Sequence, residues 1–89
     1  MSFRLMPGDV RTIGRAAGAQ FVLDAPLVSR VHCRVTCSAE GHLAVEDLGS
    51  TNGTFVDAQR VEGTVPLSAG VELRVGRVEF AVVKMETVA

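Results

Sequence analysis

The 89-residue sequence predicts an all-β fold, either a β-sandwich or a small barrel, and three observations lead to this prediction. Val31–Cys37 alternates strictly between apolar and polar side chains, which is the period of a half-buried strand. Turn residues such as Gly, Pro, Asp and Asn interrupt the chain at short intervals. No stretch has the spacing of an amphipathic helix. We expect nine or so strands in a single domain over residues 1–89, with its core at about 3–85.

In the first half of the chain, apolar or alternating runs stop at turn residues. Pro7-Gly8-Asp9 ends the first run, and Pro26 stiffens the loop Asp24–Pro26 after the third. Ser38–Gly41 has the composition of a hairpin connection. The expected strands are Phe3–Met6, Val10–Gly14, Gln20–Leu23, Val31–Cys37 and the segment that contains Leu43 and Val45.

The second half begins with a polar loop, Asp47–Gly53. A short strand, Thr54–Val56, then ends at Asp57–Arg60. Because of Pro66, we expect Gly63–Gly70 to be irregular. Val71, Leu73 and Val75 alternate with polar residues, Gly76-Arg77 turns the chain, and Val78–Met85 closes the sheet.

Composition excludes several classes of protein. Nine basic and ten acidic residues give a formal charge of -1, without the basic excess through which nucleic-acid binders neutralise phosphates. No apolar run is long enough for a membrane span, so we expect no membrane insertion. Cys33 and Cys37 on one extended strand would lie roughly 13 Å apart at ~3.3 Å per residue, too far for a disulfide. We expect both to be core residues, and free thiols favour a reducing, cytoplasmic location. No cofactor or metal site is expected, since the two histidines add too few ligands.

Three predicted loops carry polar residues that the strands do not need. They contain Gly14-Arg15, then Ser29-Arg30-Val31-His32, then Asp47-Leu48-Gly49-Ser50-Thr51-Asn52-Gly53-Thr54. Guanidinium groups form forked bonds to phosphate, and hydroxyls donate to its remaining oxygens. This set of groups is suited to a dianionic ligand attached to a peptide backbone.

In these three blocks the sequence resembles the forkhead-associated (FHA) domain family, over about residues 3–85. The resemblance implies an antiparallel β-sandwich whose loops at one end bind phosphothreonine in a partner protein, the product of a Ser/Thr kinase. It implies that Arg15, Ser29 and Thr51 bind the phosphate. Arg30 would contact the phosphate or the adjacent peptide backbone, and Asn52 the peptide main chain.

The resemblance gives other residues structural or selective roles. Gly14, His32 and Gly53 would be architectural. The residue three places after the phosphothreonine would be read near Leu27, with Arg60 as a competing reader. The sequence departs from the family at Asp57-Ala58, where many members have Asn-Gly, and at Gly70-Val71, where many have Gly-Asp.

Each motif also has a simpler structural interpretation. Arg15 alone is a common surface charge, Ser29 could cap a turn, and Asn52-Gly53 is a hairpin dipeptide. An enzyme is disfavoured, because Gly49–Gly53 is not a nucleophile elbow and Gly14–Gly18 lacks the Lys of a nucleotide-binding loop. A phosphate-independent interaction module of the same fold remains the alternative to phosphothreonine binding.

Overall fold

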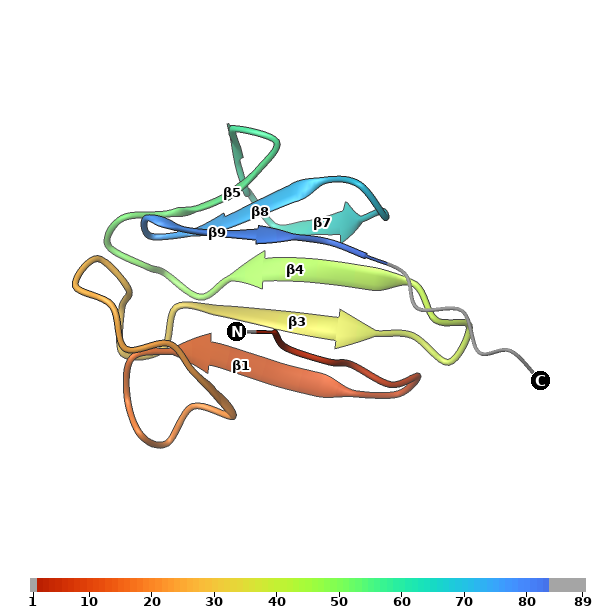
Figure 1. The fold of residues 1–89 in the computed structure, drawn as a ribbon, viewed down its shortest axis with the longest axis horizontal. Coiled ribbons are helices and arrows are strands. Elements are labelled where there is room, and N and C mark those ends of the chain that lie inside the picture. Colours follow the sequence, from red (N-terminus) through yellow and green to blue (C-terminus); the bar gives the residue numbers. More distant parts are fainter. Residues whose placement is uncertain (1, 84–89) are drawn as a thin grey trace.

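The alternating segment near residue 35 forms the centre of the first of two β-sheets. A computed structural model describes residues 2–83, and in this part of the chain there are nine strands and no helix (Figure 1). The first sheet has the order β2-β1-β3-β4-β7, and the second has the order β6-β5-β8-β9. The strands are β1 Val10–Gly14, β2 Phe21–Val22, β3 Cys33–Cys37, β4 Leu43–Asp47, β5 Thr54–Val56, β6 Gln59–Arg60, β7 Thr64–Leu67, β8 Glu72–Val75 and β9 Val78–Ala81.

The core lies between the inner faces of the two sheets. In β3 the alternation places Cys33, Val35 and Cys37 in the interior, as predicted for a half-buried strand. Leu73 and Val75 of β8 face them from the second sheet. Both cysteines are free and buried, as the sequence predicted. Burial raises the pKa of the Cys33 thiol to about 12; a hydrogen bond with Thr54 opposes this shift, and the charge of Asp47 adds to it.

The prediction of a strand at Phe3–Met6 is wrong, because these residues form no ladder. Phe3 instead stacks on Phe21, with ring centroids 4.5 Å apart, and lies 5.3 Å from the ring of Phe80. The aromatic rings therefore join the first sheet to the second through side-chain packing alone. An apolar run predicts burial here, but it does not predict which backbone will pair with it.

The prediction that Gly63–Gly70 is irregular is wrong for four of its residues. Thr64–Leu67 is strand β7, which pairs antiparallel with β4, and Pro66 lies opposite Ala44. Proline cannot donate to a ladder, but β7 is the edge of the first sheet, where one side of the strand needs no partner. Pro66 is exposed at this edge, so it does not interrupt the pairing.

Other boundaries differ by a few residues. The strand expected at Gln20–Leu23 is only Phe21–Val22, and it pairs with β1 in parallel. The strand expected at Val31–Cys37 begins at Cys33, and the last one ends at Ala81. Residues 84 and 85 of that predicted strand, and of the predicted core, lie outside the described residues.

The turn Asp57-Ala58 joins β5 to a further short strand, β6, that the sequence did not predict. Both turn residues have positive φ, 47° and 66°. This is the backbone of a two-residue hairpin turn, for which Asn-Gly is the most favourable pair. The departure from the family at this position therefore keeps the turn and changes only its residues.

Candidate phosphopeptide-binding site

All three loops singled out by the sequence lie at one end of the sandwich. Strands β1, β4 and β8 end there, and β3, β5 and β9 begin there, on the left of Figure 1. We call residues 15–20 the first loop, 23–32 the second loop and 48–53 the third loop. The turn at Gly76-Arg77 between β8 and β9 joins them at the same end.

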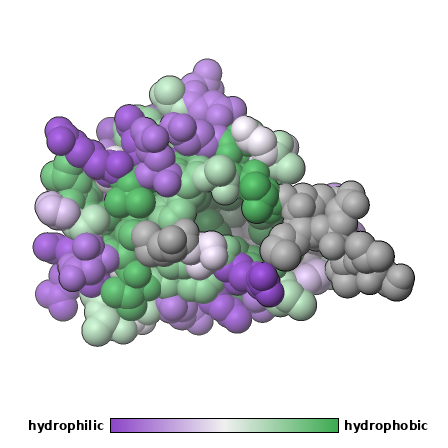
Figure 2. All heavy atoms as spheres, viewed as in Figure 1, coloured by the Kyte–Doolittle hydropathy of each residue, from purple (hydrophilic) through white to green (hydrophobic). Residues whose placement is uncertain are grey.

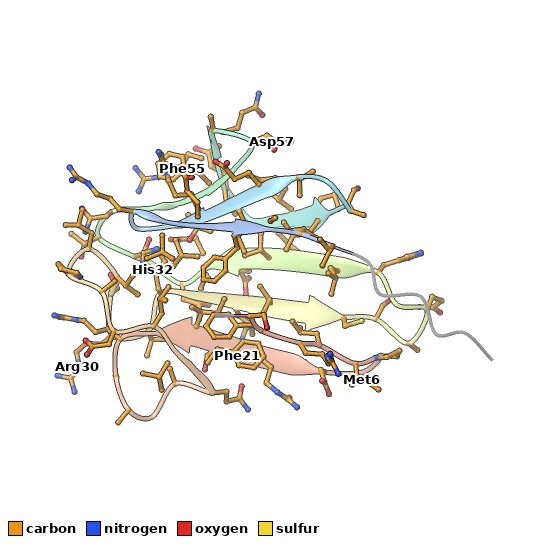
Figure 3. The ribbon with its side chains drawn as sticks, viewed as in Figure 1. Met6, Phe21, Arg30, His32, Phe55 and Asp57 are labelled. Carbon is orange, nitrogen blue, oxygen red and sulfur yellow. The ribbon has the colours of Figure 1, made fainter. Side chains whose placement is uncertain are left out.

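Backbone contacts join the first loop to the second. The N–H of Arg15 donates to the carbonyl of Ser29 at 2.9 Å, and that of Ala16 donates to the carbonyl of Arg30 at 3.1 Å. A Cβ on Gly14 would lie 2.0 Å from the Arg30 carbonyl oxygen, so only glycine allows this approach. The contact places the exposed Arg15 and Arg30 on neighbouring loops, and Figure 3 shows Arg30 at this end of the molecule.

Neither arginine is neutralised inside the described part of the chain. The ion pairs within residues 2–83 are Arg11–Asp9 and Arg34–Glu46, both on the first sheet or its turn. The guanidinium groups of Arg15 and Arg30 are therefore available to an anion from solution.

Ser29 connects the second loop to the third through its side chain. Its Oγ accepts a hydrogen bond from the Thr51 N–H at 3.0 Å. Because this bond uses a lone pair of Oγ, the hydroxyl hydrogen remains free to donate to a ligand. Ser29 is half-buried while Thr51 is exposed, so the two hydroxyls lie at the surface of the same loop junction.

His32 is buried beneath these loops and links them from below (Figure 3). Its Nδ1 lies 3.0 Å from the Ser29 nitrogen, which can only donate, so Nδ1 is the acceptor. Its Nε2 must then carry the hydrogen and donate to the Gly53 carbonyl at 2.8 Å. The network thus assigns a neutral ring with the proton on Nε2. Gly53 itself has φ +88°, a conformation that favours glycine.

Asp47 holds the third loop in shape, a role that the sequence analysis did not assign. One carboxylate oxygen accepts from the N–H groups of Gly49 (3.1 Å) and Ser50 (3.0 Å). The other accepts from the hydroxyls of Ser50 (2.5 Å) and Thr54 (2.7 Å). Ser50 Oγ in turn accepts from the Gly53 N–H at 3.0 Å. An Asp with Ser three residues later, before a glycine-rich turn, is the sequence signal for such a loop.

The same bonds set the ionisation of Asp47. Partial burial acts to raise its pKa, but the hydrogen bonds from Ser50, Thr54 and Gly49 together outweigh burial and lower it. The carboxylate is therefore ionised at neutral pH and is fully used as an acceptor inside the loop.

Asn52 joins the third loop to the second near the β8–β9 turn. Its Nδ2 donates to the Leu27 carbonyl at 3.1 Å; the residue is exposed, and its Oδ1 and second N–H have no partner among residues 2–83. A Cβ on Gly76 would lie 2.6 Å from the same carbonyl oxygen, so this turn also abuts Leu27. The sequence predicts only a turn at Gly76, and the close approach of this residue to Leu27 is a tertiary feature.

The two predicted selectivity residues face different parts of the loop cluster. Leu27 is half-buried beside Asn52 and Gly76. Arg60 lies on β6, where its guanidinium carbon is 3.5 Å from the position of a Cβ on Gly53. Leu27 thus contacts Asn52, and Arg60 contacts the next residue of the third loop.

The described residues contain no group of His, Cys, Asp or Glu suited to a metal ion. Within the same residues, no helix is long and apolar enough to cross a membrane.

Comparison with known proteins agrees with this arrangement. A sequence model of the FHA domain matches residues 11–76. The FHA domain-containing protein FhaB of Mycobacterium tuberculosis is 38% identical over 65 residues, which are 73% of this chain and 41% of that protein. The chain therefore spans about two fifths of the length of this relative.

Two solved structures have the same fold. The FHA domain of CT664 from Chlamydia trachomatis superposes on this chain with a TM-score of 0.89 and 29% sequence identity. The superposition covers 94% of this chain and 85% of the CT664 chain. The N-terminal FHA domain of Rad53p from S. cerevisiae, in complex with a phosphothreonine peptide, has a TM-score of 0.67 and 34% identity over 76% of this chain and 56% of that one. The family model covers well over half of the chain, and the fold and loop geometry agree with it: this chain belongs to the FHA domain family.

Proposed function

We propose that this domain is an interaction module that binds phosphothreonine-containing segments of partner proteins, made by a Ser/Thr kinase. One observation carries the proposal. Two arginines that form no ion pair within residues 2–83, and two residues with exposed or half-exposed hydroxyl side chains, belong to loops that hydrogen bonds hold together at one end of the sandwich.

In this proposal each side chain uses the donors that the fold leaves free. The guanidinium of Arg15 and the hydroxyls of Ser29 and Thr51 bind the phosphate oxygens. Arg30 contacts the phosphate or the adjacent peptide backbone. Asn52 uses its remaining amide groups on the peptide main chain, as main-chain recognition of an extended ligand requires. The activity is binding without catalysis.

The Rad53p domain gives the proposal independent support. That domain is 34% identical to this chain and its structure holds a phosphothreonine peptide. This chain matches only part of each of these longer relatives. The proposal therefore concerns the domain alone and not the activities or partners of whole proteins.

The direct test is calorimetric titration with a phosphothreonine peptide and its unmodified twin. We expect weak to moderate binding of the first, since the contact is smaller than a standard interface, and none of the second. Equal binding of the two peptides would instead support the alternative, a phosphate-independent interaction module of the same fold.

A phosphoserine peptide of the same sequence tests recognition of the threonine methyl. If a pocket buries this methyl, the loss is about 0.8 kcal/mol, or roughly fourfold in affinity. Equal affinities would refute the methyl pocket.

We further propose that Leu27 favours Ile, Leu or Val three residues after the phosphothreonine. An aliphatic side chain gains about 25 cal/mol per Å² removed from water, whereas an unpaired carboxylate against Leu27 is costly. A phosphothreonine library randomised at this position should show aliphatic enrichment. Enrichment of Asp or Glu would mean that Arg60 reads the position.

We also propose a cytoplasmic location, which the two free thiols favour.

A further inference from the structure

The outer face of the second sheet carries a row of side chains that the phosphate loops do not use. Arg60 of β6 lies opposite Phe55 of β5, and Phe55 lies opposite Arg74 of β8. Residues directly opposite one another point to the same face of a sheet. We call Arg60, Phe55 and Arg74 the Arg–Phe–Arg row; Figure 3 shows Phe55 on the side of the second sheet that faces away from the first.

Arg74 is held on the aromatic ring, with its guanidinium carbon 4.2 Å from the Phe55 centroid. This is the geometry of a cation–π contact. Its Nε is the single buried side-chain nitrogen or oxygen of the described residues that has no hydrogen-bond partner. A buried donor without an acceptor is costly, and a charged one more so, so the fold leaves Arg74 incompletely satisfied, although the Nε itself is covered by protein.

Arg60 brings a second positive charge to the same ring. The guanidinium carbon of Arg60 and the edge of Phe55 both lie against Gly53, 3.5 Å and 2.9 Å from the position of its absent Cβ. Gly53 follows Asn52 directly, so the row is continuous with the third loop. From Asn52 to Phe55 is three residues, at most about 10 Å.

The nearby carboxylate does not neutralise the row. Glu79 of β9 lies opposite Arg74 in the register, but no ion pair joins them, and within residues 2–83 Arg60 has none either. Figure 2 shows hydrophilic residues gathered over this upper side of the molecule. One guanidinium group therefore lies over the ring and a second lies close to its edge, and within residues 2–83 neither forms an ion pair.

We propose that the Arg–Phe–Arg row is a second anion-binding position, which takes a carboxylate or a second phosphate on the same ligand as the phosphothreonine. The proposal rests on the proposed function for its ligand. Leu27 contacts Asn52 and Arg60 contacts the next residue, Gly53, so the second anion belongs within about five residues of the phosphothreonine along the ligand. An acidic, or doubly phosphorylated, segment is the partner chemistry that fits both positions.

The experiment scans one Asp, and separately one phosphoserine, through five positions on each side of the phosphothreonine in a peptide with neutral flanks. Titration calorimetry of the wild-type domain should show roughly three- to fivefold tighter binding at one or two adjacent positions, the upper part of the range for an exposed ion pair. The Asp and phosphoserine scans distinguish the two sources of the anion.

Substitution then assigns the gain to the row. Arg74→Gln should reduce the gain and leave the affinity for the neutral-flanked peptide unchanged. Arg60→Gln should also reduce the gain. Glu79→Gln should increase the gain, because it removes the carboxylate opposite Arg74. Arg11→Gln is the matched control, since it removes the same charge from the first sheet and should change nothing.

Several outcomes would overturn the proposal. The first is that no peptide position gives a gain in affinity above twofold. The second is a gain that survives both arginine substitutions. The third is that Arg11→Gln reduces the gain as much as the two substitutions in the row do. If no phosphothreonine peptide binds, the proposed function fails on its own. The row is then tested by titrating inorganic phosphate and following the Nε–H NMR signal of Arg74, and the absence of a shift there would refute the row as an anion site.

Discussion

Replacement of Asp47 by Ala should destabilise the domain more than any other single change in the third loop. The substitution removes the acceptor of two backbone N–H groups and two hydroxyls. Water can replace it at the exposed Gly49 N–H, but Thr54 is fully buried and Ser50 nearly so. A buried polar group left unsatisfied costs about 1–3 kcal/mol, so two hydroxyls give about 2–4 kcal/mol, allowing for partial rearrangement.

This loss is large for a domain of 89 residues, whose total stability is on the order of 5–10 kcal/mol. Urea denaturation followed by circular dichroism measures it directly, and the melting temperature should fall by on the order of 10–20 °C. Asp47→Asn is the matched control. It keeps an acceptor for the backbone N–H groups and should lose less stability than Asp47→Ala. A loss below about 0.5 kcal/mol in Asp47→Ala would refute the view that this carboxylate organises the loop.

The pH dependence of stability gives the same residue a second test. Folding lowers the pKa of Asp47 below its ordinary value of 3.8, so its contribution is fully present above that value. The contribution is lost as the pH falls through the folded pKa. The stability difference between the wild type and Asp47→Asn should therefore be constant above about pH 5 and shrink below pH 4. A difference that does not change with pH would contradict the assignment.

Three further perturbations test the site, the β5–β6 turn and the core. Arg15→Ala should weaken phosphothreonine peptide binding about ten- to a hundredfold in calorimetry, since hydrogen bonds to charged groups contribute about 1.5–3 kcal/mol. Because the Arg15 side chain is exposed, its removal should leave the melting temperature unchanged. Normal peptide binding by this variant would show that Arg15 is not part of the site. Ala58→Gly should stabilise the domain by about 0.5–1 kcal/mol in urea denaturation, because Ala58 has φ +66°, whereas Ala58→Val should destabilise it. Cys33 is buried and its pKa is raised to about 12, so it should resist iodoacetamide in the native protein at pH 8 and react in urea. Mass spectrometry follows the alkylation, and rapid reaction of the native protein would contradict the burial of this thiol.

Local pattern was sufficient to predict the parts of this fold in which each residue's environment follows from its near neighbours. The alternation around Val35 identified the inner face of the central strand, and the turn residues at Ser38–Gly41 identified the hairpin that follows it. The three polar blocks identified the loops, because side chains such as those of Arg15, Ser29 and Asn52 have no use within a short, half-buried strand.

The tertiary structure decided what depends on contacts between distant segments. Phe3 lies outside any strand although its half-buried ring packs against Phe21 and Phe80, and Pro66 lies within one because β7 is a sheet edge. From the sequence alone, an apolar segment that packs only through its side chains looks the same as one whose backbone pairs in a sheet. An edge strand likewise looks the same as a central strand. Partners up to 22 residues away along the chain set several features of the site. They leave the hydroxyl hydrogen of Ser29 free, fix the ring tautomer of His32 and pair Phe55 with Arg60 and Arg74. The composition of the loops thus predicted an anion site, while hydrogen bonds between the loops determined which donors remain free for a ligand.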